Sequence, residues 1–212
     1  MEIQARQRRK YTKRIAPVRR RDLIQATIRD ISAHGYDQVT VASICEEAGF
    51  SRGLIGHYFS SKNELLLEAV KTVADQIGAA FQDALATAGK DPRARLHALI
   101  AASFRPPAFT AENVAVWVSL VSAARWSPQL AKVYRTIWLE YRAGVARLVG
   151  RAAAGSGVKA DRVALTFSQM VEGFWIGLAA DPQSVSPEEA EECCHAYIDL
   201  ILPPPVHSKS TR

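Results

Sequence analysis

The stretch between Arg52 and Tyr58 carries residue types that contact nucleic acid. The outward-facing candidates are Arg52, Gly53, Gly56, His57 and Tyr58. An arginine can pair with a guanine edge or a phosphate, and glycines let another backbone approach closely. Lys62 follows in the first turn of the next predicted helix, where a cation opposes the helix dipole unless an anion is bound nearby. These residues predict contact with DNA.

Two short helices must position these side chains. Thr40 is expected to cap the first, whose apolar face consists of Val41, Ile44, Cys45 and Ala48. Gly49 ends it, and Ser51 is expected to cap a second helix over 52–59, with Leu54, Ile55 and Phe59 as the candidates for packing. Helices this short need packing to hold them, and a tight turn between them is typical of a helix-turn-helix. From spacing alone, an ordinary corner inside a helical bundle is an equal alternative.

The positive charge of the chain is concentrated at its N-terminus. The 212 residues carry 27 Lys and Arg and 21 Asp and Glu, for a net charge of +6. Residues 1–21 hold nine basic side chains and one acidic one, which leaves 18 basic and 20 acidic residues in the other 191. The excess charge therefore forms an N-terminal arm, which either repels itself in solution or binds a polyanion.

The apolar periodicity is helical throughout, and no alternation with period two predicts a sheet. The fold class is therefore predicted to be all-α, with about nine helices. A capping box at Ser61–Glu64 opens the fourth helix, and later helices are expected over 111–126, 128–153, 160–180 and 187–202. The predicted organisation is a disordered basic arm (1–16), a three-helix helix-turn-helix domain (17–63), a larger helical ligand-binding and dimerisation domain (64–202) and a disordered tail (203–212).

The second half of the chain is rich in aromatic residues. All four tryptophans follow residue 110, and Glu172 lies within the apolar run from Met170 to Leu178. An unpaired carboxylate there is unfavourable, whereas a cationic ligand would neutralise it and aromatic faces would attract the same cation. The predicted ligand-contacting residues are Phe104, Trp117, Trp126, Tyr141, Glu172 and Trp175. Core packing is the alternative, and the default role for such rings.

Two apolar stripes near the C-terminus are candidates for a dimer face. The first consists of Val163, Phe167, Met170, Phe174 and Leu178, and the second of Ala190, Cys194, Tyr197 and Ile201. A homodimer is expected because helix-turn-helix proteins usually bind two half-sites with two-fold symmetry. For about half of these residues, packing against the protein's own core is the better interpretation.

No arrangement of residues predicts catalysis or a bound cofactor. The sequence has no glycine-rich phosphate loop and no nucleophile elbow. Cys193-Cys194-His195 is a poor metal site because adjacent cysteines do not readily share a tetrahedral zinc, and Cys45 is expected to be buried and inert. Three cysteines fit a reducing cytoplasm, and the apolar run from Val114 to Ala124 is too short to span a bilayer. A cytoplasmic protein without membrane, metal or cofactor is expected.

The stretch from Ala48 to Lys62 reads AGFSRGLIGHYFSSK, and matching positions around it include Leu23, Ala26, Gly35, Thr40, Ile44 and Leu65-Leu66. With these residues, the segment 19–66 resembles the N-terminal DNA-binding domain of the TetR family of bacterial repressors. The resemblance implies that Ser51 binds a phosphate, that Lys62 binds the DNA backbone, and that Arg52, Gly53, Gly56, His57 and Tyr58 face DNA. Thr40, at the start of the first short helix, completes the predicted DNA-binding set.

The segments Ala115–Val118, Pro128–Leu148 and Val171–Trp175 resemble the BetI-like subgroup of that family, whose best-known members repress glycine-betaine synthesis genes and respond to choline. The resemblance implies a ligand-responsive repressor that pairs through the helices over 160–180 and 187–202. It would bind a palindromic operator of double-stranded DNA as a homodimer and be released by a small-molecule effector, choline or a related cation. Effector binding would tilt the fourth helix and change the spacing of the recognition helices. A helical scaffold without sequence-specific DNA binding is the alternative.

Overall fold

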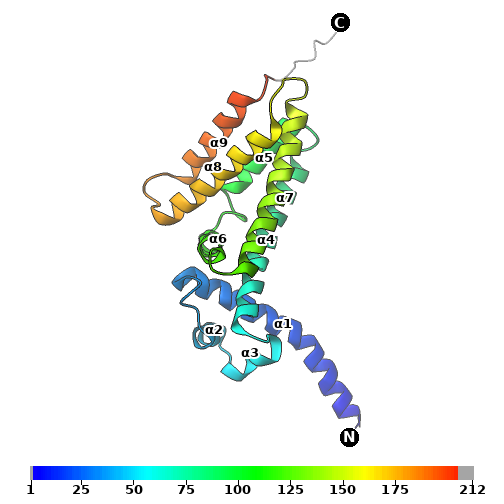
Figure 1. Cartoon of the computed structure of the whole chain (residues 1–212). Helices are drawn as coiled ribbons and strands as arrows, with labels where there is room; N and C mark the ends of the chain where they lie inside the picture. Colours follow the sequence, from blue (N-terminus) through cyan, green and yellow to red (C-terminus); the bar gives the residue numbers. More distant parts are fainter. Residues whose placement is uncertain (1, 205–212) are drawn as a thin grey trace. The chain divides into compact units, whose positions relative to one another are not determined.

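The computed structural model describes residues 2–204, with side chains described from Pro17 onward except that of Leu54. Within that range the chain forms nine α-helices and no strand, so the all-α prediction is confirmed there (Figure 1). The helices are α1 (Glu2–His34), α2 (Val41–Ala48), α3 (Arg52–Tyr58), α4 (Lys62–Thr87), α5 (Pro92–Ser103), α6 (Ala111–Ala124), α7 (Pro128–Ala152), α8 (Ala160–Ala180) and α9 (Pro187–Ile201). Most of the predicted C-terminal tail lies outside the described residues.

The helices fall into two compact units. The N-terminal unit comprises the chain up to Asp75 together with residues 111–133, and the C-terminal unit comprises residues 76–110 and those from Tyr134 onward. The division thus falls inside α4, whereas the sequence predicts a domain boundary between residues 63 and 64. The difference arises because the start of α4 carries core side chains: Leu65 and Leu66 are fully buried.

Helix α1 begins earlier than the sequence analysis expects. Its backbone is helical from Glu2, whereas the prediction places a disordered arm over 1–16 and starts the helix at Pro17. Residues 2–16 are rich in Arg, Lys, Gln and Ala, which are good helix formers even without apolar periodicity. Apolar periodicity identifies helices that bury one face, so it misses a helix whose residues favour helical backbone but are mostly polar.

The core of the N-terminal unit lies between α1, the two short helices and the start of α4. Its fully buried side chains include Leu23, Ile28, Ile31, Val39, Ile44, Leu65 and Leu66. Helix α6 also packs on α1, and contributes Val116 and Leu120 to buried positions. This packing supplies the stability that helices of seven and eight residues lack by themselves.

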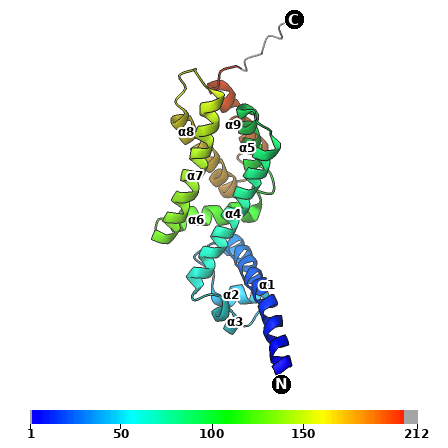
Figure 2. The ribbon, with the colours of Figure 1, turned by 90° about the vertical axis from the view of Figure 1, so that its right-hand side faces the viewer.

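The C-terminal unit is built from helices with strong start signals. Asp91 caps α5 by accepting from the Ala94 N–H at 2.7 Å, and Ser186 forms a capping box with Glu189 at the start of α9. Helix α9 packs on α5 and on α8 (Figure 2). Polar contacts join α5 and α9, including a 2.6 Å contact between the Nδ1 atoms of His97 and His195.

Helix α8 is long and apolar enough, by length and composition, to cross a membrane, a feature that the sequence analysis did not single out. It is the one such helix among the described residues, with a mean hydropathy of 1.3. Buried helices of domain cores pass the same test, and 44 % of its apolar window is buried inside the protein. Phe167, Val171 and Trp175 on this helix are core residues of the C-terminal unit.

Candidate functional site

The turn between α2 and α3 has the geometry expected of a helix-turn-helix. Gly49 adopts the left-handed conformation with φ of 66°, which favours glycine. The Phe50 N–H then donates to the Cys45 carbonyl at 2.9 Å, so the chain reverses within three residues before α3 begins. The predicted end of the first short helix at Gly49 is confirmed.

Helix α3 presents a polar face to solvent and an apolar face to the core. Ser51, Arg52, Gly53, Gly56 and His57 are exposed, and Tyr58 is half-buried. Ile55 and Phe59 are buried, as the sequence predicts, while the side chain of Leu54 lies outside the described residues. Among the described residues, the side chains of Ser51, Arg52 and His57 form no hydrogen bond or ion pair with the protein. This face is therefore available to an external partner.

The two glycines of α3 are not required by the protein's own packing. A Cβ atom built on Gly53 or on Gly56 would meet no heavy atom within 4 Å. Glycine inside a helix is less favourable than alanine by up to about 1 kcal/mol. The absence of a side chain at these positions thus leaves space outside the protein, as the close approach of a DNA backbone requires.

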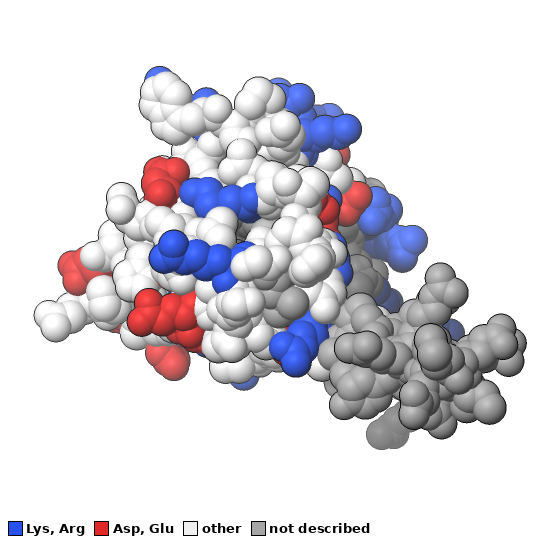
Figure 3. All heavy atoms as spheres, turned by 90° about the horizontal axis from the view of Figure 1, so that it is seen from below, with Lys and Arg blue, Asp and Glu red and all other residues white. Residues whose placement is uncertain are grey.

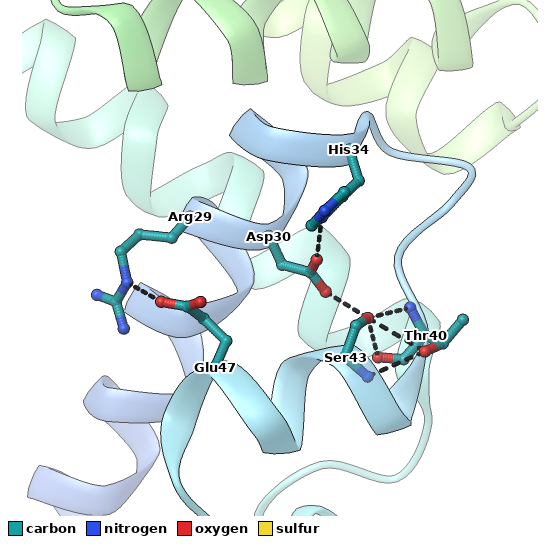
Figure 4. Close-up of polar contacts among 6 residues, drawn as sticks. All are labelled: Arg29, Asp30, His34, Thr40, Ser43 and Glu47. Atoms are coloured by element: carbon teal, nitrogen blue, oxygen red, sulfur yellow. Dashed lines mark hydrogen bonds and ion pairs between the residues drawn. The ribbon is translucent and has the colours of Figure 1, made fainter.

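A polar network fixes the start of α2 (Figure 4). The Thr40 hydroxyl accepts from the Ser43 N–H at 3.0 Å, and the Ser43 hydroxyl accepts from the Thr40 N–H at 2.9 Å. The same Ser43 hydroxyl donates to the buried Asp30 of α1, which also contacts His34 Nδ1 at 2.8 Å. The predicted N-cap at Thr40 is confirmed. Because Asp30 holds the capping box, the orientation of α2, and hence of the turn to α3, is tied to α1.

Lys62 and Ser51 occupy the starts of the two helices that follow α2. Lys62 Nζ donates to the Val39 carbonyl at 2.9 Å, which ties the first turn of α4 to the segment that precedes α2. One of its three N–H groups is used in this way, and two are left for a phosphate. Ser51 stands at the N-cap position of α3, but its hydroxyl makes no capping hydrogen bond. Figure 3 shows Lys and Arg side chains at several places on this face, with acidic side chains mostly on the left and a few right of centre.

Glu172 lies at the centre of a second polar site, inside the C-terminal unit. Its side chain is buried, with 7 % of its surface exposed. One carboxylate oxygen accepts from the Tyr134 hydroxyl at 2.8 Å and from Trp138 Nε1 at 3.1 Å, and the other accepts from Gln169 Nε2 at 3.2 Å. Burial, followed by the hydrogen bond to Glu172 and its charge, raises the pKa of Tyr134, which therefore stays a hydrogen-bond donor.

The sequence predicts Glu172 as a carboxylate without partners, and this is wrong, because Tyr134, Trp138 and Gln169 donate hydrogen bonds to it. Tyr134, Trp138 and Tyr141 recur at i, i+4 and i+7 on α7, so the spacing that would have revealed them is present in the sequence. The charge of Glu172 is satisfied by hydrogen bonds, yet the structure records no ion pair for it among the described residues.

Aromatic rings of the C-terminal unit extend from this carboxylate in two directions. The Tyr141 ring lies 5.6 Å from those of Trp138 and Phe81, and its buried hydroxyl has no hydrogen bond among the described residues. On α8, Trp175 Nε1 donates to the Ser103 carbonyl at 2.8 Å, and its ring meets Phe109 edge-on at 5.5 Å. The Phe104 ring is tilted against that of Phe109 at 6.2 Å and meets that of Phe174 edge-on at 6.0 Å.

The six predicted ligand-contacting residues are divided between the two units. Phe104, Tyr141, Glu172 and Trp175 belong to the C-terminal unit, and Trp117 and Trp126 belong to the N-terminal unit. Trp117 is a buried residue of α6. Trp126 is 80 % exposed and packs against the Arg125 guanidinium, so it lies at the surface of its unit. The structure therefore brings together four of the six residues within one unit.

The predicted dimer stripes face mainly inward. Val163, Phe167, Leu178, Ala190 and Cys194 are buried in the C-terminal unit, as the core-packing alternative proposed for about half of them. Other apolar and small residues of α8 and α9 are exposed, among them Leu165, Gly173, Ile176, Cys193, Ala196 and Leu200. They recur at helical spacing on each helix and form one exposed face per helix. We call these residues the exposed α8–α9 face.

The three cysteines are free thiols. Cys45 is buried, and burial raises its pKa, which agrees with the expectation of an inert thiol. Cys194 is also buried, with a pKa raised to about 12 by burial and by the neighbouring Cys193, which is exposed. Within the described part of the chain, no three His, Cys, Asp or Glu side chains are grouped so that they could hold a metal ion.

Two family profiles match the chain. The profile described as "Bacterial regulatory proteins, tetR family" matches residues 23–69, and the profile described as "BetI-type transcriptional repressor, C-terminal" matches residues 92–203. The chain belongs to the TetR family. The first match contains α2, α3 and the start of α4, and the second contains α5 to α9. The protein is therefore a helix-turn-helix transcriptional regulator, and both resemblances noted in the sequence are confirmed.

Individual relatives agree with this assignment to the TetR family. The HTH-type transcriptional regulator BetI of Burkholderia ambifaria is 30 % identical over 189 residues, which cover 87 % of this chain and 94 % of that protein. A transcriptional regulator from Pseudomonas aeruginosa PAO1 superposes with a TM-score of 0.75 at 28 % identity, over 85 % of this chain and 88 % of that one. A regulator from Saccharomonospora viridis, solved in complex with choline, has the same fold, with a TM-score of 0.75 at 23 % identity over 86 % and 96 % of the two chains.

Proposed function

We propose that the protein is a dimeric repressor that binds a palindromic operator through α3 and releases it when a cationic effector, choline or a related quaternary ammonium compound, binds beside Glu172. A regulator of this kind acts on the chromosome, so a cytoplasmic location follows, and no catalytic step is required. The observation that carries the proposal is the exposed face of α3, where Arg52 and His57 make no hydrogen bond or ion pair with the residues that the structure describes and two glycines leave open space.

The DNA contacts are assigned from this geometry. Arg52 and His57 are placed to meet base edges or phosphates in the major groove, with Tyr58 beside them and Gly53 and Gly56 at the closest approach. Ser51, Thr40 and Lys62 lie at the starts of α3, α2 and α4, where helix N-termini favour phosphate. Ser51 would bind a phosphate through its hydroxyl, which makes no capping hydrogen bond. Lys62 would bind one through the N–H groups that do not donate to the Val39 carbonyl.

The effector is assigned from the surroundings of Glu172. A quaternary ammonium group has no N–H to donate, so it is recognised by negative charge and by aromatic faces. Glu172 supplies the charge, and Tyr134, Trp138 and Tyr141 supply the rings within the same unit. The buried hydroxyl of Tyr141 offers a partner to the hydroxyl of choline. The choline-bound relative supports this class of effector.

Dimerisation is assigned to the exposed α8–α9 face. Leu200 is 85 % exposed, and Leu165 and Ile176 are the other large apolar side chains that these two helices expose. The small residues Gly173 and Ala196 lie between them and allow helices of a second copy to pack closely. Two copies paired in this way would present two recognition helices to successive turns of the operator.

Helix α4 provides the covalent route between effector and DNA. Its first part, with Lys62, belongs to the N-terminal unit, and its last part, with Phe81 next to Tyr141, belongs to the C-terminal unit. A change in the position of the Phe81 end on effector binding would move the Lys62 end, and the coupling free energy in such systems is typically about 1–3 kcal/mol.

The proposal is tested by fluorescence anisotropy with DNA fragments from the promoter of the protein's own gene, at several salt concentrations and with and without choline. The expected result is sequence-specific, salt-sensitive binding that choline weakens by about 5- to 150-fold. Arg52→Ala should reduce the preference for the operator over a scrambled sequence, whereas Arg151→Ala, an exposed arginine at the end of α7, should leave it unchanged. Equal affinity for all sequences would show a helical scaffold rather than a regulator.

A further inference from the structure

The basic segment at the N-terminus, residues 1–21, is not explained by the helix-turn-helix. It holds nine Lys and Arg and one Glu, while the rest of the chain has two more acidic than basic residues. The TetR profile begins only at residue 23, so the whole excess of positive charge lies outside the part of the chain that the profile matches. A segment of this charge next to a DNA-reading domain requires a function of its own.

The last turn of the basic segment is fixed beside the recognition helix. The Arg19 guanidinium lies 4.9 Å from the centroid of the Phe50 ring, and that of Arg20 lies 4.8 Å from the Phe59 ring. Phe50 immediately precedes the Ser51 N-cap of α3, and Phe59 is its C-cap residue. Consecutive arginines of α1 therefore contact the residues at both ends of the helix that is assigned to the major groove.

An ion pair strengthens this attachment. Arg20 Nη2 lies 2.9 Å from the Glu68 carboxylate of α4, and the hydrogen bond from Arg20 is the main cause of a lowered pKa of Glu68. The charges of Arg19 and Arg20 are thus engaged within the protein. Arg21 is exposed and remains available to an external polyanion.

The basic positions upstream share a helix face with Arg20. Arg6, Arg9, Lys10 and Lys13 follow the spacing i, i+3, i+4 and i+7, and Arg20 comes seven residues after Lys13. Because the backbone of α1 is helical from Glu2, positions with this spacing lie on one face. Fifteen helical residues extend about 22 Å, and duplex DNA carries one charge per about 1.7 Å of its axis.

We propose that residues 2–16 form a second DNA-binding element, which contacts the phosphate backbone of the duplex flanking the sequence read by α3. The inference rests on the proposed operator binding and adds a sequence-independent component to it. The ligand is the sugar-phosphate backbone of double-stranded DNA, recognised by charge. The contacts of Arg19 and Arg20 with the two ends of α3 favour DNA over a lipid surface, and the segment has few apolar positions with which to enter a bilayer.

The test compares the full chain with a variant in which the six basic residues at 6, 8, 9, 10, 13 and 14 are replaced by Gln, which keeps chain length and helix propensity. Operator affinity is measured by anisotropy between 50 and 300 mM salt, on a DNA with and without about 10 flanking base pairs on each side. Each phosphate contact contributes about 0.9 to the slope of log K against log salt, so loss of four contacts per protomer lowers the slope by about 3.6 per protomer. The affinity at low salt should fall by about 10²- to 10³-fold, and only on the longer DNA.

A matched pair of single substitutions tests the helical face. Arg9 shares the face of Arg20 and Arg8 does not, so Arg9→Gln should weaken binding about threefold more than Arg8→Gln. The preference for operator over scrambled DNA should stay the same in all these variants, because phosphate contacts carry no base information.

The outcomes separate this inference from the proposed function. If the full chain shows no preference for the operator, the proposed function fails. If the full chain binds its operator and the six-Gln variant has the same affinity and salt slope, only the second DNA-binding element is overturned. If the variant keeps operator binding but loses binding to vesicles of phosphatidylserine, the segment is a membrane-binding element and the inference is wrong.

Discussion

The recognition helix and the Glu172 cluster use polar side chains in opposite ways. At the N-cap and along α3, Ser51, Arg52 and His57 are exposed and make no hydrogen bond or ion pair within the described part of the chain. The polar contacts that fix the helix-turn-helix are made elsewhere, by Thr40, Ser43 and Asp30. In the C-terminal unit, Glu172 is buried and already holds three hydrogen bonds. A polyanion is bound by charge that stays accessible to it, whereas a small cation is bound by charge that is shielded from water.

The recognition helix and the exposed α8–α9 face each leave a surface that the protein itself does not cover. Gly53 and Gly56 leave space above α3, and the exposed α8–α9 face leaves large apolar side chains without a partner. Both are unfavourable in an isolated chain, since helical glycine reduces stability and exposed leucine is unburied apolar surface. In both regions, the features that the chain alone does not explain are those that a partner would complete.

The largest effect is expected at the exposed α8–α9 face. Leu200→Glu places a charge where a second copy should pack, so the dimer should dissociate into folded monomers. Operator affinity should then fall by about 10²- to 10⁴-fold, because two linked recognition helices bind far more tightly than one. Light scattering after size exclusion gives the oligomeric state, and anisotropy gives the affinity. Leu139→Glu, at a residue of α7 that is 57 % exposed, is the matched control and should leave both unchanged; a Leu200→Glu protein that remains dimeric would place the interface elsewhere.

The next effect concerns the charge of Glu172. Glu172→Gln keeps an oxygen that accepts from Tyr134 and Trp138 but removes the negative charge. Choline affinity, measured by titration calorimetry, should fall by about 10- to 100-fold, while affinity for a neutral isostere of choline should hardly change. Glu140→Gln on the exposed side of α7 serves as the control. Equal losses for the charged and the neutral compound would mean that Glu172 supports the fold of the site without recognising charge.

A third prediction separates stability from binding on α3. Gly56→Ala adds a methyl group that meets nothing in the protein, so the N-terminal unit should become more stable by up to about 1 kcal/mol. The same methyl group should obstruct the DNA backbone and weaken operator binding about tenfold. Thermal unfolding and anisotropy measure the two effects. Gly78 on α4 also has open space around it, so Gly78→Ala should raise stability without changing the affinity for DNA. If Gly56→Ala leaves the affinity for DNA unchanged, the DNA backbone does not approach α3 closely at this position.

A smaller effect is expected at Tyr141. Its buried hydroxyl makes no hydrogen bond of good geometry with the described residues, although the Ser103 side chain is close enough to lower its pKa in part. Burial is the larger influence and raises that pKa, so the group is neutral. Tyr141→Phe removes this unsatisfied group and should stabilise the free protein by about 1 kcal/mol, as measured by urea unfolding. Choline affinity should decrease a few-fold if its hydroxyl pairs with Tyr141. A loss of stability in the Phe variant would show that the hydroxyl already has a partner in solution.

The smallest effect is a pH dependence at Arg20–Glu68. The pKa of Glu68 is held below its ordinary value of 4.5, first by the hydrogen bond from Arg20 and also by Lys71. A lowered carboxyl pKa contributes stability that is present above the ordinary value and lost as the pH falls through the lowered one. The pair is half-exposed and screened by solvent, so the contribution is about 0.5 kcal/mol. Glu68→Gln should remove that part of the stability difference between pH 7 and pH 3, and an unchanged difference would show that the pair is not formed in solution.

Much of the helical plan was predictable because its signals are local. The predicted starts at residues 111, 128 and 187 agree with α6, α7 and α9, and the predicted span over 160–180 agrees with α8. The predicted ends of α6, α7 and α9 lie within two residues of the observed ones. Helix caps and stops act within about four residues of chain, so both partners of each contact stand close together in the sequence. Examples are the caps at Thr40, Asp91 and Ser186 and the stop at Gly49. The two short helices and the turn between them follow from the same local signals, but only the resemblance to the TetR family distinguished a helix-turn-helix from an ordinary helical corner.

The tertiary structure decided which way the helices face. Phe167 and Cys194 are as apolar in sequence as Leu165 and Leu200, yet the first pair is core and the second is surface. Likewise, only the fold shows that Tyr134 and Trp138 donate to a carboxylate more than thirty residues away, and that Arg19 and Arg20 contact the two ends of α3. Helical periodicity identifies a face, but the partner of that face lies far along the chain, and packing between distant segments chooses it.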